Sequence, residues 1–539
     1  MSSNKEPKVA YFCMEYGLDK AIRIYAGGLG ILAGDILKAA KELNKPMIGI
    51  GILWRQGYTK QLIAEDGRPY DSYHNNDYMY KLLDDTGITV TVRIRDEDII
   101  CKVWKLQRYD NVPLYLLDTN HKKNANKWIT GQLYGWFVEE RIAQELILGV
   151  GGIKLIRKLG LNIDIYHFNE GHAVFAGIEL IREKIKQGHT FDEALAEVRK
   201  EIVFTTHTPV KEGNEKHRLD SIRYMGGFRG LTLEQMVKIG GAPFNMTVAG
   251  LRLSHMANAV AELHAVTARK MWEHVDNKPP IIAITNGVHH KTWVDQRIRE
   301  AYDQGKLLWP VHQELKKELI KYIKQKTGVN LSSDKLLIGF ARRAAPYKRS
   351  DLIFSKASII GPYLKEGKIQ LVFSGKAHPL DDTGKRIISS LVKMSKKYQH
   401  SVVFLEDYNM EIGKKLTRGI DLWLNNPRRP KEASGTSGMK AAMNGVLNMS
   451  ILDGWWPEAC EDGVNGWQFG DGYQDSDQDK QDEHDLKALY EVLLNKVVPT
   501  YYHNRERWEE MMKASIESTY ERFSAKRMLK RYYKEIYTF

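Results

Sequence analysis

Residues 420–451 read IDLWLNNPRRPKEASGTSGMKAAMNGVLNMSI, and this stretch decides the fold class. Its two apolar runs, 420–424 and 446–451, have the length and composition of buried strands. Between them, small and hydroxylated residues open a helical segment that carries Lys440. A strand, a helix and a second strand in this order predict two neighbouring strands of a parallel sheet.

The same alternation recurs along the chain in two blocks. The first block contains the apolar runs 8–13, 46–52, 112–117, 163–168, 201–206 and 280–284, and the second contains 336–341, 369–374, 401–406, 420–424 and 446–451. We therefore expect an α/β protein with two Rossmann-like, doubly wound domains, residues 1–290 and 291–539. The closing helical stretch, 485–537, is expected to pack back across the N-terminal domain. Residues 255–274 read as an amphipathic helix, and 472–484 read as a surface loop.

Composition excludes several classes of protein. With 539 residues, 43% hydrophobic and 27% charged, the chain is neither a small module nor a disordered protein. The net charge is +13, but the basic residues alternate with acids along helical stretches, which is typical of solvated faces rather than of a nucleic-acid-binding arm. Cys13, Cys101 and Cys460 are far apart and lack metal-site spacing. We expect a cytoplasmic protein with no nucleic-acid or membrane partner and no metal.

Three loops that follow predicted strands could bind anions, because open α/β sheets bind ligands at the carboxyl ends of their strands. Residues 26–30, AGGLG, lead directly into a helical pattern, and glycines there would let a phosphate approach the helix N-terminus. A tight strand-to-helix turn would need the same glycines. Residues 342–349, RRAAPYKR, hold four cations that could neutralise a dianion, or could form a basic surface turn.

The third loop is 431–440, KEASGTSGMK. A lysine held in a packed, partly apolar place is easily lowered in pKa and can form an imine with an aldehyde such as pyridoxal phosphate. The alternative is a capped helix with a solvent-facing lysine. Asn and His side chains at other strand ends, in 167–172, 205–209 and 285–288, could bind sugar hydroxyls. Glu170 and His172 could instead bind a metal, although they lack the spacing of a common metal motif.

Taken together, these segments resemble the α-glucan (glycogen, starch, maltodextrin) phosphorylases. These are pyridoxal-phosphate-dependent retaining glycosyltransferases of GT-B architecture, in which two Rossmann-like domains face a central cleft. The family's cofactor-lysine segment, Glu-Ala-Ser-Gly-Thr-x-x-Met-Lys, stands at Glu432–Lys440. Its phosphate segment, Lys-Arg-x-x-x-Tyr-Lys-Arg, is matched by Arg342-Arg343 and by Tyr347-Lys348-Arg349. Residues 27–30, 206–208 and 285–287 match three further family segments in the right order.

The resemblance implies reversible phosphorolysis of a terminal α-1,4-linked glucose, which gives α-glucose 1-phosphate with retention. It implies that Lys440 holds pyridoxal phosphate as an imine and that the cofactor's own phosphate exchanges a proton with the substrate phosphate. The catalytic residues would be Arg343, Lys348 and His207. The further cofactor-binding residues would be Arg342, Thr436, Ser437, Gly438, Gly27, Gly28 and Trp293. The substrate-binding residues would be Leu29, Asn286, Tyr347, Glu432, Ser434 and Gly435.

The chain also departs from the family pattern. Arg342 stands where a lysine is usual, Ala26 replaces an asparagine, and 169–172 replaces a segment of Asp-Thr-His type. Two alternative functions are a nucleotide-sugar-dependent glycogen or starch synthase and a non-catalytic glucan-binding protein. Lys440 favours the phosphorylases over both. The family also implies a homodimer, and the short length implies a catalytic core without a phosphorylation or nucleotide switch.

Overall fold

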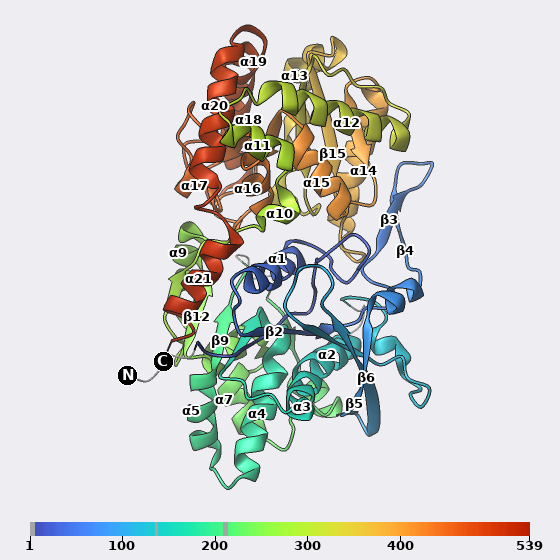
Figure 1. Ribbon diagram of the computed structural model, residues 1–539, viewed down its shortest axis with the longest axis vertical. Coiled ribbons are helices and arrows are strands. Elements are labelled where there is room, and N and C mark those ends of the chain that lie inside the picture. The colour runs from blue at the N-terminus through green and yellow to red at the C-terminus, as the bar shows by residue number, and fades with distance from the viewer. Residues whose placement is uncertain (1–5, 135–137, 209–213, 539) are drawn as a thin grey trace. The chain divides into compact units, whose positions relative to one another are not determined.

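The computed structural model describes residues 6–134, 138–208 and 214–538, and it divides into two compact units (Figure 1). Unit 1 comprises Met1–Thr59, Tyr73–Thr285 and Ala525–Phe539, and unit 2 comprises Lys60–Ser72 and Asn286–Ser524. The chain therefore passes between the units more than once. The assignment of glucan binding to residues 1–290 and of cofactor binding to residues 291–539 stays a prediction.

Unit 1 contains a nine-stranded sheet in the order β13-β12-β9-β8-β1-β2-β7-β6-β5. The parallel strands are β1 (Val9–Phe12), β2 (Met47–Ile52), β7 (Leu114–Asp118), β8 (Ile165–Asn169), β9 (Ile202–Thr205), β12 (Met256–Ala259) and β13 (Ile281–Ala283). Two antiparallel strands, β5 (Asp84–Ile94) and β6 (Glu97–Leu106), extend one edge. The helices are α1 (Gly28–Glu42), α2 (Val138–Leu146), α3 (Gly152–Lys158), α4 (Val174–Lys186), α5 (Phe191–Glu201), α6 (Leu219–Tyr224), α7 (Leu233–Gly240), α8 (Met246–Leu253), α9 (Glu262–Met271) and α21 (Ala525–Glu535).

Unit 2 contains a six-stranded, fully parallel sheet in the order β16-β15-β14-β17-β18-β19. The strands are β14 (Leu336–Ala341), β15 (Ile369–Ser374), β16 (Val402–Leu405), β17 (Leu422–Asn425), β18 (Leu447–Ile451) and β19 (Gly466–Phe469). The helices are α10 (His290–Trp293), α11 (Gln296–Asp303), α12 (Trp309–Thr327), α13 (Ala357–Lys365), α14 (Asp382–Lys397), α15 (Met410–Gly419), α16 (Thr436–Ala442), α17 (Trp456–Ala459), α18 (Gln478–Val492), α19 (Val498–His503) and α20 (Arg505–Thr519). A hairpin of β3 (Lys60–Ile63) and β4 (Pro69–Ser72) belongs to this unit.

The unit 2 sheet is buried on both faces. Along β14, Leu336, Ile338 and Phe340 pack in one apolar cluster with residues of α18 and α20. Leu337 and Ala341 pack in a second cluster with residues of α12 and α15. Alternate residues of one strand thus face opposite helical layers, which explains why the strand reads as a continuous apolar run.

All eleven predicted apolar runs form strands, and the doubly wound α/β fold is confirmed. Two expectations are wrong. Met256–Ala259 is strand β12 and not part of a helix. The prediction failed because this short segment fits both the two-residue period of a strand and the 3.6-residue period of a helix. Helix α18 begins at Gln478, inside the expected surface loop, because the Asp477 side chain accepts the backbone N–H groups of Asp479 and Lys480. The apolar runs also do not predict the β5–β6 hairpin.

Each sheet has a switch point, which is the place where the order in which the chain adds strands to the sheet reverses direction. In unit 1 the chain runs outward through β2 and β7 on one side of β1, and through β9, β12 and β13 on the other side of β8. In unit 2 the reversal lies between β14 and β17. Such points are the usual ligand sites of open α/β sheets. In the part of the chain that the structure describes, no helix is both long enough and apolar enough to cross a membrane.

Candidate functional site

A charged cluster lies at the switch point of unit 2. Arg342 directly follows β14, and its guanidinium donates a hydrogen bond to the Oδ1 atom of Asn425 at the end of β17. The other terminal nitrogen of Arg342 lies 2.7 Å from a carboxylate oxygen of Glu432. The Asn425 amide in turn donates to the hydroxyl of Ser450 in β18, at 3.0 Å. Three neighbouring strand ends thus hold one arginine in a fixed position.

Glu432 joins two of the predicted phosphate-binding cations. The Lys348 ammonium lies 2.7 Å and 3.0 Å from the two Glu432 carboxylate oxygens, and all three charged side chains are buried. Burial alone would raise the pKa of Glu432, but the charges of Arg342 and Lys348 outweigh it and hold the pKa below its ordinary value. Because two cations share one carboxylate, the cluster carries a net positive charge that suits an anion.

Asp453 is a member of this cluster that the sequence analysis missed. Its two carboxyl oxygens accept the backbone N–H groups of Glu432, at 2.9 Å, and of Gly454, at 2.8 Å. Burial, followed by the charge of Glu432, raises the pKa of Asp453 to about 8. At pH 7 it is mostly protonated and does not cancel the positive charge. Asp453 follows the run 446–451 by two residues. Because ligands bind at the carboxyl ends of strands in open α/β sheets, this position could have identified Asp453 as a candidate from the sequence.

The segment 434–438 is crowded and needs its glycines. Gly435 has a φ of +83° and caps the start of α16. A Cβ atom on Gly438 would lie 2.7 Å from Asn448 Oδ1 and 2.9 Å from Trp455 Nε1. Beside them, the Ser434 hydroxyl is buried and has no hydrogen-bond partner among the described residues. Such a group is suited to bind a hydroxyl or an anion of a ligand.

Lys440 lies on the packed side of α16. Its side chain is only 7% exposed, and its ammonium lies 3.5 Å from the ring centroid of Trp293. Asn444 holds the two segments together, because its amide donates to the backbone oxygens of Trp293, at 3.1 Å, and of Lys440, at 2.8 Å. The alternative of a solvent-facing lysine is therefore wrong. The structure brings the predicted cofactor residues Lys440 and Trp293 into contact.

The other predicted residues of unit 2 have different surroundings. Arg343 is exposed, whereas Asn286 is buried. Tyr347 is half-buried, with its ring centroid 4.9 Å from the Lys348 ammonium. Thr436 and Ser437 are half-buried in the first turn of α16.

In unit 1, the predicted glycine turn lies at the start of α1. A Cβ atom on Gly27 or Gly28 would meet no atom within 4 Å, and neither residue has a positive φ. A Cβ on Gly30, in contrast, would lie 2.7 Å from a carboxylate oxygen of Glu15. The requirements of a tight turn thus explain Gly30 but neither Gly27 nor Gly28. Backbone contact with a ligand would explain both, and Leu29 beside them is half-buried.

Glu15 holds this turn, and the sequence analysis missed it as well. One carboxylate oxygen accepts the backbone N–H groups of Ala26, at 2.6 Å, and of Gly27, at 3.0 Å. The other accepts the hydroxyl of Tyr134 at 2.6 Å. Glu15 follows the run 8–13 by two residues, as Asp453 follows its own run.

His207 lies beyond β9, beside the end of β8. Its Nε2 atom is hydrogen-bonded to the Oδ1 atom of Asn169, and its backbone N–H donates to Glu170. The same Glu170 oxygen accepts the backbone N–H of Thr208 at 3.1 Å. Burial lowers the pKa of His207 to about 3, so its ring is neutral. Glu170 itself has a φ of +71°, an unusual conformation for a residue other than glycine.

Comparison with known proteins agrees with this arrangement. A family model described as carbohydrate phosphorylase matches residues 295–492, which contain the charged cluster and Lys440. A maltodextrin phosphorylase of Thermococcus litoralis is 38% identical over 99% of this chain and 71% of its own length. A glycogen phosphorylase of Aquifex aeolicus is 36% identical over 99% of this chain and 86% of its own length. The chain belongs to the carbohydrate phosphorylase family. A further relative, "Uncharacterized protein MJ1631" of Methanocaldococcus jannaschii, is 35% identical over 98% of this chain and 99% of its own length.

Membership in the carbohydrate phosphorylases confirms the predicted family. Two doubly wound α/β units are what the family's GT-B class of architecture requires. In this phosphorylase the two segments that carried the resemblance, 342–349 and 432–440, are joined through the pairing of Glu432 with Arg342 and Lys348.

Proposed function

We propose that this carbohydrate phosphorylase catalyses reversible phosphorolysis of α-1,4-linked glucans. Phosphate would cleave the terminal glucose from the non-reducing end and give α-glucose 1-phosphate, with retention at the anomeric carbon, and a shortened chain. The observation that carries the proposal is the cluster of Arg342, Lys348 and Glu432 at the switch point of a family member. Two of its relatives are named as a maltodextrin phosphorylase and a glycogen phosphorylase.

The charge balance of the cluster supports a role in phosphate binding. Arg342 and Lys348 share the single charge of Glu432, while the raised pKa of Asp453 keeps that carboxyl mostly neutral at pH 7. We infer that Lys348 exchanges Glu432 for the substrate phosphate and that exposed Arg343 contributes a second cation. Glu432 would then be available to accept a hydrogen bond from a sugar hydroxyl.

The residues of unit 2 fit pyridoxal phosphate. Lys440 is buried beside Trp293, and the preceding segment 434–438 is built from small residues with an unpartnered hydroxyl at Ser434. Lys440 and Trp293 would hold the cofactor, with Thr436, Ser437, Gly438 and Arg342 near its phosphate. When bound, the cofactor supplies a phosphate group that can donate and accept a proton. In unit 1, the open backbone of Gly27 and Gly28 is proposed to bind phosphate as well.

The transferred glucose would be held by hydrogen bonds from both polar side chains and backbone. The residues that we propose for this role are Asn286, Tyr347, Glu432, Ser434, Gly435, His207 and Leu29. Neutral His207 can donate or accept without adding charge. Such contacts accelerate the reaction to the extent that they strengthen as the sugar ring flattens toward the transition state. A homodimer is proposed from the family resemblance alone.

The function is tested by incubating the purified protein with inorganic phosphate and maltooligosaccharides of graded length. We expect release of α-glucose 1-phosphate that requires both substrates, and the dependence on length identifies the preferred glucan. Absence of glucose 1-phosphate with every glucan, from protein that carries its cofactor, would contradict the proposal.

The cofactor is tested separately. We expect a yellow-tinted protein that releases pyridoxal phosphate in acid, and borohydride should fix a pyridoxyl group on the peptide that contains Lys440, as read by mass spectrometry. A colourless protein that releases no pyridoxal phosphate would contradict the assignment of Lys440.

A further inference from the structure

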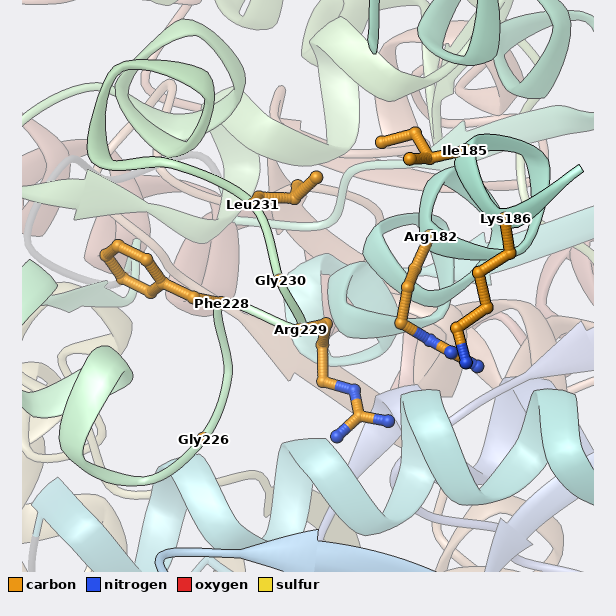
Figure 2. Close-up of a pocket in the computed structure, with 8 residues that line it drawn as sticks. All are labelled: Arg182, Ile185, Lys186, Gly226, Phe228, Arg229, Gly230 and Leu231. Atoms are coloured by element: carbon orange, nitrogen blue, oxygen red, sulfur yellow. The ribbon is translucent and has the colours of Figure 1, made fainter. Parts of the chain in front are cut away.

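A cavity of about 600 Å³ opens in unit 1 between the last turns of α4 and the segment 226–231 (Figure 2). It is lined by Arg182, Ile185, Lys186, Gly226, Phe228, Arg229, Gly230 and Leu231. Its size is within the usual range for sites that bind small molecules. No residue of this lining has a role in the proposed phosphorolysis.

The lining contains three cations and no acid. Arg182 and Lys186 are four residues apart on α4, so they share one face of the helix. Figure 2 shows these two side chains extending in the same direction from the helix. Arg229 has a φ of +53° between two glycines of positive φ, Gly226 and Gly230. The segment 226–231 thus supplies the third cation of the lining.

One fully buried carboxylate, Glu179, orients the two arginines. Arg182 donates two hydrogen bonds to it, at 2.8 Å and 2.6 Å, and Arg229 donates one from Nε at 3.0 Å. Burial would raise the pKa of Glu179, but the two arginines outweigh it and hold the pKa below its ordinary value. The pairing leaves both terminal nitrogens of Arg229 without a hydrogen-bond partner among the described residues.

The positive charge is not balanced by other acids. The Lys186 side chain makes no hydrogen bond or ion pair with any described residue. Lys154 is a further cation near Arg229, since its pKa is lowered by burial and then by the charge of Arg229. Its ammonium donates to the backbone oxygen of Thr91 at 2.7 Å. The two other acids that act on these cations already have arginine partners: Glu183 lies 2.8 Å from Arg157 and Asp98 lies 3.3 Å from Arg93.

The rest of the lining is apolar. Ile185, Phe228 and Leu231 also line the cavity, and Figure 2 shows the Phe228 ring extending away from the cations. The Arg223 guanidinium lies 4.7 Å from the Phe228 ring centroid. Two guanidinium groups and an ammonium match the three oxygens of a phosphate dianion better than the two of a carboxylate.

We propose that this cavity is a second phosphate site, which binds the phosphate group of a monoester through Arg229, Arg182 and Lys186. The proposal is independent of the proposed phosphorolysis, because the cavity uses none of the residues assigned to that reaction. Two sources could supply the ester. One is the glucose 1-phosphate of the proposed reaction, and the other is an ester made by a different enzyme.

The test measures binding of phenyl phosphate to the full chain by calorimetry. The Lys348→Ala background weakens the proposed substrate-phosphate site, so that the second site is observed by itself. We expect about one equivalent of phenyl phosphate to bind in this background. Lys186→Glu should weaken binding about tenfold or more, the loss expected when one charge-assisted hydrogen bond is removed. Lys158→Glu, an exposed change of the same charge on α3, should leave binding unchanged.

Arg229→Gln provides a second variant, with folding checked by circular dichroism because Glu179 then keeps Arg182 as its arginine partner. It should also weaken binding at least tenfold. Displacement of phenyl phosphate by glucose 1-phosphate would identify the product of the proposed reaction as the ligand, and its absence would identify another ester. Equal binding by the Lys186→Glu and Lys158→Glu chains, or no binding of phenyl phosphate at all, would overturn the proposal while leaving the proposed phosphorolysis untouched.

Discussion

At the scale of single residues, Glu432 links the two buried cations of the charged cluster in unit 2. It is ion-paired with Arg342 and Lys348 and donates its backbone N–H to Asp453. A buried ion pair contributes little net stability compared with an apolar core, but removal of one member is costly because the other is left buried without a counter-charge. Glu432 therefore balances the charge of both buried cations, and the contribution of its own charge to stability can be tested by varying the pH.

Replacement Glu432→Gln should lower the free energy of unfolding at pH 7 by about 3–5 kcal/mol, because two buried cations lose the carboxylate that they share. The folded-state pKa of Glu432 lies below the ordinary value of 4.5, so its contribution is fully present above pH 4.5 and is lost as pH falls through the folded-state pKa. The difference between wild type and variant should shrink below pH 4.5, as measured by urea unfolding at several pH values.

Glu366→Gln is the matched control for this experiment, because Glu366 is exposed and forms a surface pair with Lys368. It should change the free energy of unfolding by less than about 1 kcal/mol at any pH. A difference for Glu432→Gln that stays constant down to pH 3 would show that its carboxylate charge is not what stabilises the cluster.

Lys348→Ala should reduce phosphorolysis at least about 100-fold, the loss typical of a group that stabilises charge in a transition state. The content of pyridoxal phosphate should stay the same, because Lys440 contacts Trp293 and lies on a different element from Lys348. The measurements are glucose 1-phosphate release at increasing phosphate and cofactor released in acid. Lys356→Ala, at an exposed residue, should retain wild-type turnover. Full activity of Lys348→Ala at low phosphate would refute the role of the cluster.

At the scale of elements, the sequence predicted what depends on short-range pattern. Buried parallel strands appear as short apolar runs, and all eleven of these runs are strands, so the positions of the candidate loops were correct as well. The pairing of Glu432 with Arg342 could not be predicted in this way, because it depends on which strands become neighbours across the switch point. The same is true of Glu15 and Asp453, whose hydrogen bonds join loops from different parts of the chain.

The start of α1 allows a test of what its glycines do. Gly27→Ala and Gly28→Ala should each leave the thermal midpoint nearly unchanged, because the added methyl group meets no atom within 4 Å and φ is not positive. Each should nevertheless weaken binding of phosphate or cofactor if the backbone contacts a ligand there. Gly30→Ala should lower the thermal midpoint, because its methyl group would lie 2.7 Å from Glu15. Unchanged ligand binding in both Gly27→Ala and Gly28→Ala would leave the glycine turn without a role in binding.

At the scale of the whole molecule, the end of the chain belongs to the unit in which the chain begins. Helix α21 follows the helices of unit 2 but counts with unit 1, and Figure 1 shows it in red among elements coloured blue to green. Met528, Leu529 and Tyr532 are buried in the core of unit 1. The Tyr537 hydroxyl is hydrogen-bonded to His167 of β8 at 2.7 Å. The last fifteen residues therefore complete the core of a domain whose first strand lies more than 500 positions earlier.

The packing of α21 in the core of unit 1 predicts which unit a substitution near the C-terminus destabilises. Leu529→Ala should destabilise unit 1 by about 2–5 kcal/mol, as expected for a buried leucine truncated in a packed core. Hydrogen exchange, resolved by peptide mass spectrometry, should become faster in β8 and β9 and stay unchanged in β14 and β15. Leu493→Ala, an equally buried leucine in the core of unit 2, should give the opposite pattern. If Leu529→Ala accelerated exchange in β14 and β15 instead, the last helix would stabilise unit 2, and the division of the chain at Ser524 would be wrong.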